Sequence, residues 1–210
     1  MITRFSLADI SNMEHLYKIN LINSCSGFKS ANLIATKSAA GLENVAIFSS
    51  VTHVGSEPPL LGVFMRPTTV TRHTYDNIKE TGVYTLNHVH QNIIKEAHHT
   101  SAKYPREISE FTMAGLTPDY KPGISVPFVA SAPVQMHMKF VEEYPIKANG
   151  TILIIGRITD LFIQEDLIEP DGFVNLSKGK VATINGLDGY AVPSLNERHA
   201  YQRPKNSLIK

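Results

Sequence analysis

The sequence predicts a mainly β fold, an antiparallel β-barrel accompanied by a few peripheral helices. Two observations lead to this fold class. Strand-like apolar runs are distributed along most of the chain, whereas the helical signals cluster between residues 71 and 115. A doubly wound sheet would need strands and helices in regular alternation, and that order is absent from this sequence.

Strands are expected wherever apolar residues alternate with polar ones or β-branched residues dominate. The runs at 30–38 and 43–52 are apolar on both faces, as in strands that are buried on two sides. The other strands are expected at 16–22, 59–66, 82–89, 133–144 and 150–163. Within 133–144, alternation predicts one face with Val134, Met136, Met138 and Phe140, and an opposite face with Gln135, His137 and Lys139.

Three helices are predicted between residues 71 and 115. The first helix, 71–82, has Thr71 as its N-cap and Gly82 as its C-terminal stop. The third, 105–115, starts with Pro105, which suits a first turn, and ends at Gly115. The middle helix, 91–101, can place three apolar side chains on one face: Ile93, Ile94 and Ala97.

The composition is that of an ordinary globular protein. Of the 210 residues, 42% are hydrophobic and 19% are charged, which argues against disorder. The net charge of +1 argues against a broad nucleic-acid surface. No run approaches about 20 apolar residues, so we expect no membrane span. The N-terminus has no apolar signal-peptide core and Cys25 is the single cysteine, so we expect a reducing, cytoplasmic location.

Metal, hydrolase and acid–base chemistry each find little support in the residue pattern. His88 and His90 would share one strand face, but a zinc site needs three or four ligands, and surface or interface histidines are the simpler interpretation. No G-x-S-x-G motif is present, and alternation directs Ser50 and His53 to opposite faces. The adjacent carboxylates at 142–143 also point in opposite directions. We therefore predict no metal site and no catalytic residue.

An anion site is the stronger signal. Eight Ser/Thr residues, two arginines and two histidines lie between Ile47 and Thr74, although no G-x-G-x-x-G or Walker loop is present. Arg66 ends a predicted strand, and the run 71–74 leads into a helix. Hydroxyls, a guanidinium group and a helix N-terminus together can hold a phosphate. The alternative is ordinary helix capping with solvated turn residues.

The segment 32–89 closely resembles the flavin reductase-like, FMN-binding split-barrel family, and the likeness extends more loosely to about residue 163. The shared features are a first strand, a small-residue strand ending in Ser/Thr, a "PP" turn, another strand, an Arg/Thr-rich helix start and the pattern "TG-x-Y-x-x-N". The resemblance implies a split Greek-key barrel and a homodimer with one flavin per subunit near the interface. It also implies one domain over 1–210, in which 165–210 is an extension packed on the barrel or the partner.

The resemblance also assigns the cofactor residues, with FMN expected in preference to FAD. The residues expected beside or near the flavin ring are Asn44, Ala46, Ile47, Phe48, Ser49, Ser50, Val51 and Thr52. Those expected on the phosphate side are Arg66, Thr71, Arg72, His73 and Thr74. Because a flavin carries the redox chemistry itself, no catalytic acid or base is required.

Two functions follow from the resemblance. The first is a flavin-dependent oxidoreductase that takes a hydride from NAD(P)H and passes electrons to an acceptor. The second is a flavoredoxin-like carrier that exchanges electrons with a protein partner. The family's short NAD(P)H-dependent members carry Gly-Asp-His before a late strand, but Asn149, Gly150 and Thr151 stand there instead. A flavin-free structural barrel is a third alternative.

Overall fold

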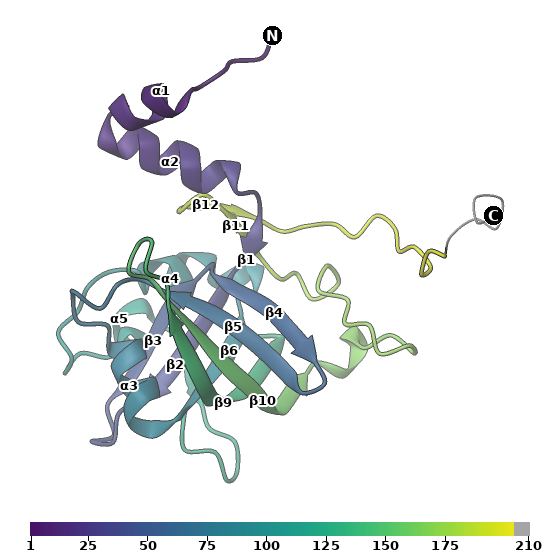
Figure 1. Cartoon of the computed structure of the whole chain (residues 1–210). Helices are drawn as coiled ribbons and strands as arrows, with labels where there is room; N and C mark the ends of the chain where they lie inside the picture. Colours follow the sequence, from purple (N-terminus) through teal and green to yellow (C-terminus); the bar gives the residue numbers. More distant parts are fainter. Residues whose placement is uncertain (204–210) are drawn as a thin grey trace.

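The computed structural model describes residues 1–203, so residues 204–210 of the expected extension lie outside the described part. Its centre is an antiparallel sheet of seven strands in the order β3-β2-β6-β9-β10-β5-β4, which curls into a barrel (Figure 1). The predicted fold class is confirmed. The strands are β2 (Asn32–Lys37), β3 (Glu43–Phe48), β4 (Val51–Ser56), β5 (Pro59–Met65), β6 (Val83–His88), β9 (Val134–Pro145) and β10 (Ile152–Ile163).

The barrel is split between its two edge strands, β3 and β4. These strands are consecutive in the chain and only Ser49 and Ser50 separate them, yet within residues 1–203 no ladder joins them. The prediction of one strand over 43–52 was wrong, because at Ser50 the chain turns away from β2 and pairs with β5 instead. The Phe64 N–H donates to the Ser50 carbonyl at 3.2 Å, which fixes this corner. β6 then crosses the barrel to β2, a connection of the Greek-key kind.

Two hydrophobic clusters lie on the two sides of this sheet. The inner cluster fills the barrel and includes Met136 and Met138 of β9, with Phe140 packed against it. This confirms the face predicted for the strand, since His137 lies on the other side with a half-buried ring. The outer cluster, which includes Ala97 and Phe111, lies under the helices that cover the sheet.

Three helices and one short 3-10 turn lie to one side of the barrel (Figure 1). They are α3 (His73–Thr81), η1 (Gln91–Ile93), α4 (Ile94–His99) and α5 (Glu110–Ala114). Gly82 and Gly115 end α3 and α5 with φ of 73° and 74°, so both predicted stops are confirmed. Thr71 is not the N-cap, because the helix begins one residue later and Arg72 occupies that position. The helix predicted from Pro105 begins only at Glu110, because a turn closed by the Ile108 N–H and the Pro105 carbonyl comes first.

The N-terminal segment is a helical arm and not a strand. It consists of α1 (Leu7–Asn12) and α2 (His15–Cys25) and projects from the barrel (Figure 1). The strand predicted over 16–22 was wrong, because Glu14 caps the helix by accepting from the Tyr17 N–H at 3.0 Å. Cys25 is the exposed last residue of α2. No helix within residues 1–203 is long and apolar enough to cross a membrane.

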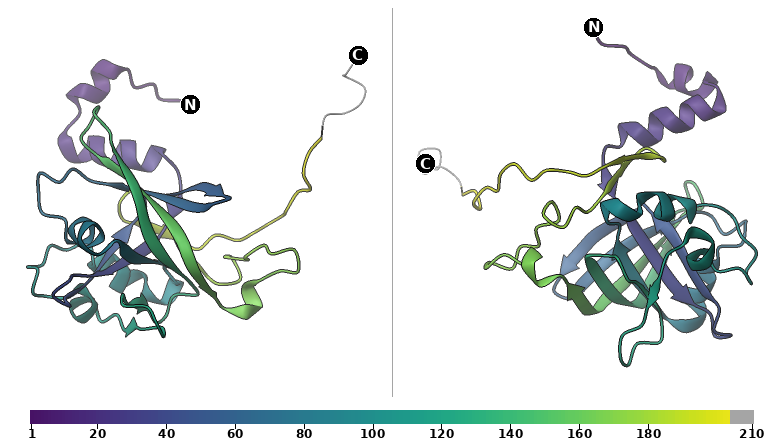
Figure 2. Two further views of the ribbon diagram at one scale, coloured as in Figure 1. Left: turned by 60° about the horizontal axis from the view of Figure 1, so that its bottom comes forward. Right: turned by 180° about the vertical axis from the view of Figure 1, so that it is seen from behind.

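The C-terminal segment after β10 covers one end of the barrel and then leaves it. After η2 (Glu165–Leu167), Val174 and Leu176 pack against the inner cluster. The strand β11 (Thr183–Asn185) pairs with both β1 (Lys29–Ser30) and β12 (Gly189–Ala191) in a small sheet that the sequence did not predict. Residues 192–203 extend away from the body in a different direction from the arm (Figure 2). A two-stranded sheet, β7 (Pro118–Asp119) and β8 (Phe128–Val129), completes the fold.

Candidate functional site

The first half of the candidate site is the corner between β3 and β4. Ala46 and Ser49 are half-buried, and Thr52 is exposed. The side chains of Ile47 and Phe48 pack against the outer and inner clusters respectively. Val51 also packs against the inner cluster, so three of the eight residues expected near the ring are partly committed to cores. The corner therefore offers a ligand mainly its backbone edge and its small polar side chains.

The second half is the start of α3. Arg72 occupies the N-cap position, but no side chain forms a capping hydrogen bond there. The first-turn N–H groups of a helix have no partner within the helix, and together with the helix dipole they favour an anion. Thr71 is exposed and His73 is half-buried. This arrangement fits a phosphate group, because its donors are free of a competing side-chain cap.

A buried hydrogen bond joins the start of α3 to the beginning of β3, the strand that leads to the corner. Asn44 Nδ2 of β3 donates to Thr74 Oγ1 of α3 at 3.0 Å, and both residues are about 95% buried. Burial takes Thr74 out of direct reach from solvent, so it acts as part of the scaffold. Just beyond the other end of β3, Ser50 Oγ donates to the Phe64 carbonyl at 2.7 Å. The structure thus brings together segments that the sequence separates by 30 residues.

The loop between β5 and α3 carries two arginines. Arg66 is exposed, and Arg72 Nε donates to the Pro67 carbonyl at 3.4 Å. The turn between β9 and β10 lies against the same loop, since a Cβ on Gly150 would be 3.6 Å from Pro67 Cγ. In that turn, the Thr151 hydroxyl donates to Asn149 Oδ1 at 2.7 Å. Residues 149–151 stand where the family's short members carry Gly-Asp-His. This turn therefore lies next to the loop that carries the candidate phosphate residues.

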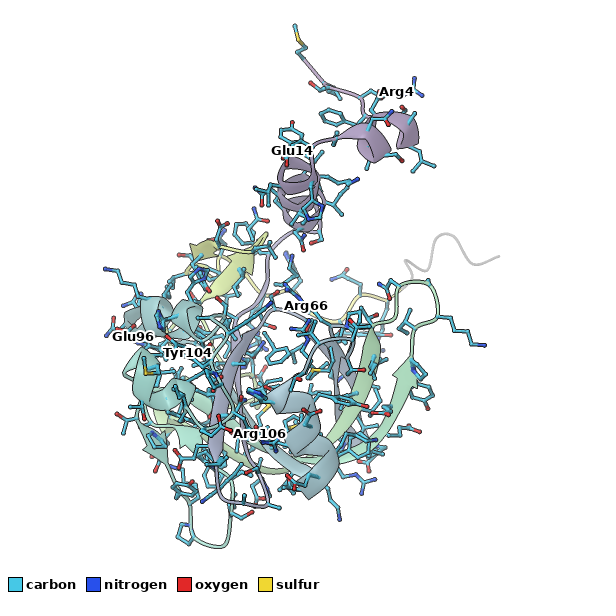
Figure 3. All side chains as sticks on the ribbon, turned by 90° about the vertical axis from the view of Figure 1, so that its left-hand side faces the viewer. Arg4, Glu14, Arg66, Glu96, Tyr104 and Arg106 are labelled. Atoms are coloured by element: carbon cyan, nitrogen blue, oxygen red, sulfur yellow. The ribbon has the colours of Figure 1, made fainter. Side chains whose placement is uncertain are left out.

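Two residues of the site were missed from the sequence, Glu110 and Arg106. Both line a small cavity of about 10 Å³, together with Asn44 and His73, enough for about one water molecule. Glu110 is the first residue of α5 and only 6% exposed, and burial raises the pKa of its carboxyl group. Figure 3 shows Arg106 and Arg66 on the barrel body, away from Arg4 and Glu14 of the arm. In sequence, "PREISEF" has the pattern of an exposed helix start. Only the tertiary packing therefore shows that Glu110 is buried in the site.

The histidines considered as metal ligands have other surroundings. His88 Nδ1 is buried without a hydrogen-bond partner, and burial lowers the pKa of His88 to about 4. His90 Nδ1 accepts from the Asn92 N–H at 3.2 Å. Within residues 1–203, no three or more His, Cys, Asp or Glu side chains are grouped so that they could hold a metal ion. His53 Nε2 lies 3.3 Å from Ser56 Oγ and not beside Ser50.

The split antiparallel barrel, with an uncapped helix start beside its open corner, defines the class as a flavin reductase-like split-barrel protein. The family model "Flavin reductase like domain" matches residues 26–184. The chain therefore belongs to this family, and the predicted resemblance is confirmed. The matched segment begins directly after the helical arm.

Solved structures agree with this assignment. A split-barrel protein from Shewanella frigidimarina, described as a flavin reductase-type protein, is 42% identical with a TM-score of 0.92, covering 95% of this chain and 100% of its own. Nitrilotriacetate monooxygenase component B from Bacillus cereus shares 22% identity with a TM-score of 0.80, covering 96% and 99%. Flavoredoxin from Desulfovibrio vulgaris shares 20% identity with a TM-score of 0.71, covering 83% and 91%. The last two similarities establish the fold alone.

Proposed function

We propose that this chain is an FMN-binding oxidoreductase that takes a hydride from NADH or NADPH and passes electrons to an acceptor. One observation carries the proposal. The Asn44–Thr74 hydrogen bond holds the beginning of β3 against the uncapped start of α3, and β3 runs from there to its corner with β4, so that the groups suited to a flavin phosphate and to its ring follow one another along this edge strand. FMN is preferred over FAD because FMN is the cofactor that the family resemblance implies.

The side chains of this chain would bind and orient the cofactor. When bound, the flavin supplies the hydride and electron chemistry. Arg66, Arg72 and the first N–H groups of α3 would hold the phosphate through charge-assisted hydrogen bonds. The backbone edge of β3 and the small side chain of Ser49 would lie along the ring. No acid or base from the protein is needed for this role.

Anaerobic reduction tests the enzyme proposal directly. The purified chain loaded with FMN is mixed with NADH or NADPH, and the visible flavin absorbance is followed with time. Rapid bleaching is the expected result. Free FMN without protein is the control, since it gives the uncatalysed rate. A protein that binds FMN but shows no acceleration over this control contradicts the reductase function.

A flavoredoxin-like electron carrier is the second candidate. The observation in its favour is the β9–β10 turn, where Asn149 and Thr151 hydrogen-bond to each other beside Pro67 and the turn itself carries no histidine. In this case, NADH and NADPH would leave the flavin oxidised. A ferredoxin-type protein donor would bleach it instead, so the same anaerobic measurement separates the two functions.

Arg72 is the residue that best tests the phosphate assignment. Replacing Arg72 with Ala should weaken FMN binding by about 10- to 150-fold, because a hydrogen bond to a charged group contributes roughly 1.5–3 kcal/mol. The affinity is measured by quenching of FMN fluorescence. Arg157→Ala is the matched control, since Arg157 is exposed on β10. Equal FMN affinity in both variants would contradict the assignment.

We also infer a homodimer of single-domain subunits, in which 165–210 is an extension packed on the barrel or on the partner. The support is unpaired apolar surface: α1 and α2 bury no residue, while Leu7 and Leu16 are 80% and 65% exposed. Such surface usually marks an interface. Light scattering coupled to size-exclusion chromatography should give twice the mass of the chain. The free thiol of Cys25 agrees with a reducing, cytoplasmic compartment.

A further inference from the structure

Glu110 is a buried acid that the assignments above do not use. It is the first residue of α5, and its Oε2 accepts from the Val45 N–H of β3 at a long 3.4 Å. Within residues 1–203, no cation forms an ion pair with it. Arg106, in the same cavity, pairs with Glu80 and donates to Asn77 instead. A carboxyl group buried without a cation is costly in its charged form.

The position of Glu110 links it to both halves of the proposed site. Val45 follows Asn44, whose side chain is bound to α3, and His73 precedes Thr74 at the start of that helix. Glu110, Asn44 and His73 line one cavity. A phosphate at the start of α3 would therefore bring a second negative charge toward this carboxyl group.

We propose that Glu110 is a selectivity residue that makes FMN binding proton-linked, because its carboxyl group opposes the phosphate when ionised and tolerates it when protonated. This inference rests on the proposed FMN function. No covalent step is involved: the protonated fraction of the Glu110 carboxyl group rises as the phosphate binds, with the proton taken from solvent, and falls again when FMN leaves.

Other charged groups face the same cavity and set the balance. Glu43 comes from β3, His73 from α3 and Arg106 from the segment before α5. Burial raises the pKa of Glu110, whereas its own N–H, the Val45 N–H and the nearby His73 side chain act in the opposite direction. α4 also packs on α5, but its two histidines bind tyrosine hydroxyls, His98 that of Tyr190 and His99 that of Tyr104.

The effect should be selective for the phosphate and should grow with pH. At an effective dielectric constant of about 20, a unit charge about 12 Å away changes an affinity by roughly tenfold. Riboflavin lacks the phosphate and is the matched ligand, because it reports any change in the rest of the site. The phosphate titrates on its own with a pKa near about 6, but this contribution is common to wild type and variant.

Fluorescence titrations of the full chain with FMN and riboflavin, from pH 5.5 to 8.5, test the proposal. Glu110→Gln keeps an acceptor for the Val45 N–H, and Glu107→Gln, at an exposed position in the same segment, is the control. At pH 8, Glu110→Gln should bind FMN roughly tenfold more tightly than wild type, with unchanged riboflavin affinity. Glu107→Gln should match wild type with both ligands.

Several results would overturn the inference. If Glu110→Gln keeps the wild-type ratio of FMN to riboflavin affinity at every pH, or weakens both ligands equally, Glu110 only secures the edge of β3. Calorimetry of FMN binding to wild type and Glu110→Gln in buffers of different ionisation enthalpy gives a second measurement, in which the contribution of the phosphate itself cancels. Wild type should take up more protons than Glu110→Gln, and equal uptake contradicts the proposal. Wild type that binds neither ligand overturns the proposed function and this inference with it.

Discussion

Acidification should destabilise this protein through one histidine at the end of β6. His88 lies opposite Asn32 of β2, and its Nδ1 is buried without a hydrogen-bond partner. Burial lowers its pKa from 6.5 to about 4. Between these values the unfolded chain binds a proton that the folded chain does not bind. The free energy of unfolding therefore falls as the pH drops through this window.

The size of the effect follows from the pKa difference. The fall in the pKa of His88 from 6.5 to about 4 corresponds to a loss of about 3.4 kcal/mol in the free energy of unfolding once the pH is below both values. His88 as a whole keeps some exposure to solvent, so this figure is a ceiling. Between pH 7 and pH 5, the linkage gives a loss of about 2 kcal/mol. Below about pH 4 this contribution stops growing, because both states are then protonated.

Urea denaturation at pH 7, 6 and 5 measures this loss. The chain has no tryptophan, so far-UV circular dichroism is the suitable signal. His88→Gln cannot titrate and should lose about 2 kcal/mol less than wild type between pH 7 and pH 5. His15→Gln, at an exposed position on the arm, should behave like wild type. The reasoning is refuted if His88→Gln and wild type lose the same free energy.

Two further predictions concern buried contacts. Gly156→Ala should destabilise the fold by about 1–3 kcal/mol, because a Cβ there would overlap the Tyr84 hydroxyl. That hydroxyl is buried and unpartnered, so Tyr84→Phe should be close to neutral alone. In the double variant it should restore part of the lost stability in a urea titration, because the ring Cζ would still lie 2.9 Å from the new Cβ. Asn77→Ala should cost about 1–3 kcal/mol in the same assay, since Asn77 donates to Thr36 at 3.0 Å and accepts from Arg106 at 3.2 Å. An unchanged midpoint would contradict either expectation.

The barrel could be predicted because its strands carry local signals. In β9, alternation alone identified the face of Met136 and Met138 that fills the barrel. In α3 and α5, Gly82 and Gly115 marked the C-terminal stops, since the left-handed conformation there favours glycine.

Other elements could not be predicted because their signals are short or tertiary. The apolar spacing over 16–22 suits a strand and a helix equally, and the cap at Glu14 decided between them. The break after Phe48 carries no glycine or proline, since it arises from the change of partner strand at Ser50. Glu110 is buried only because α5 packs over β3.

The expected cofactor residues divide into scaffold and contact groups, and this division follows from burial. Asn44 and Thr74 are buried and bound to each other, and the Ser50 hydroxyl is engaged by the Phe64 carbonyl. Exposed Arg66 and half-buried Arg72 are the cations with room to meet a phosphate. Substitution of a scaffold residue should therefore change flavin affinity by moving α3 relative to β3, and should lower stability as well. Substitution of either arginine should change affinity with little effect on stability, because surface ion contacts contribute little to folding.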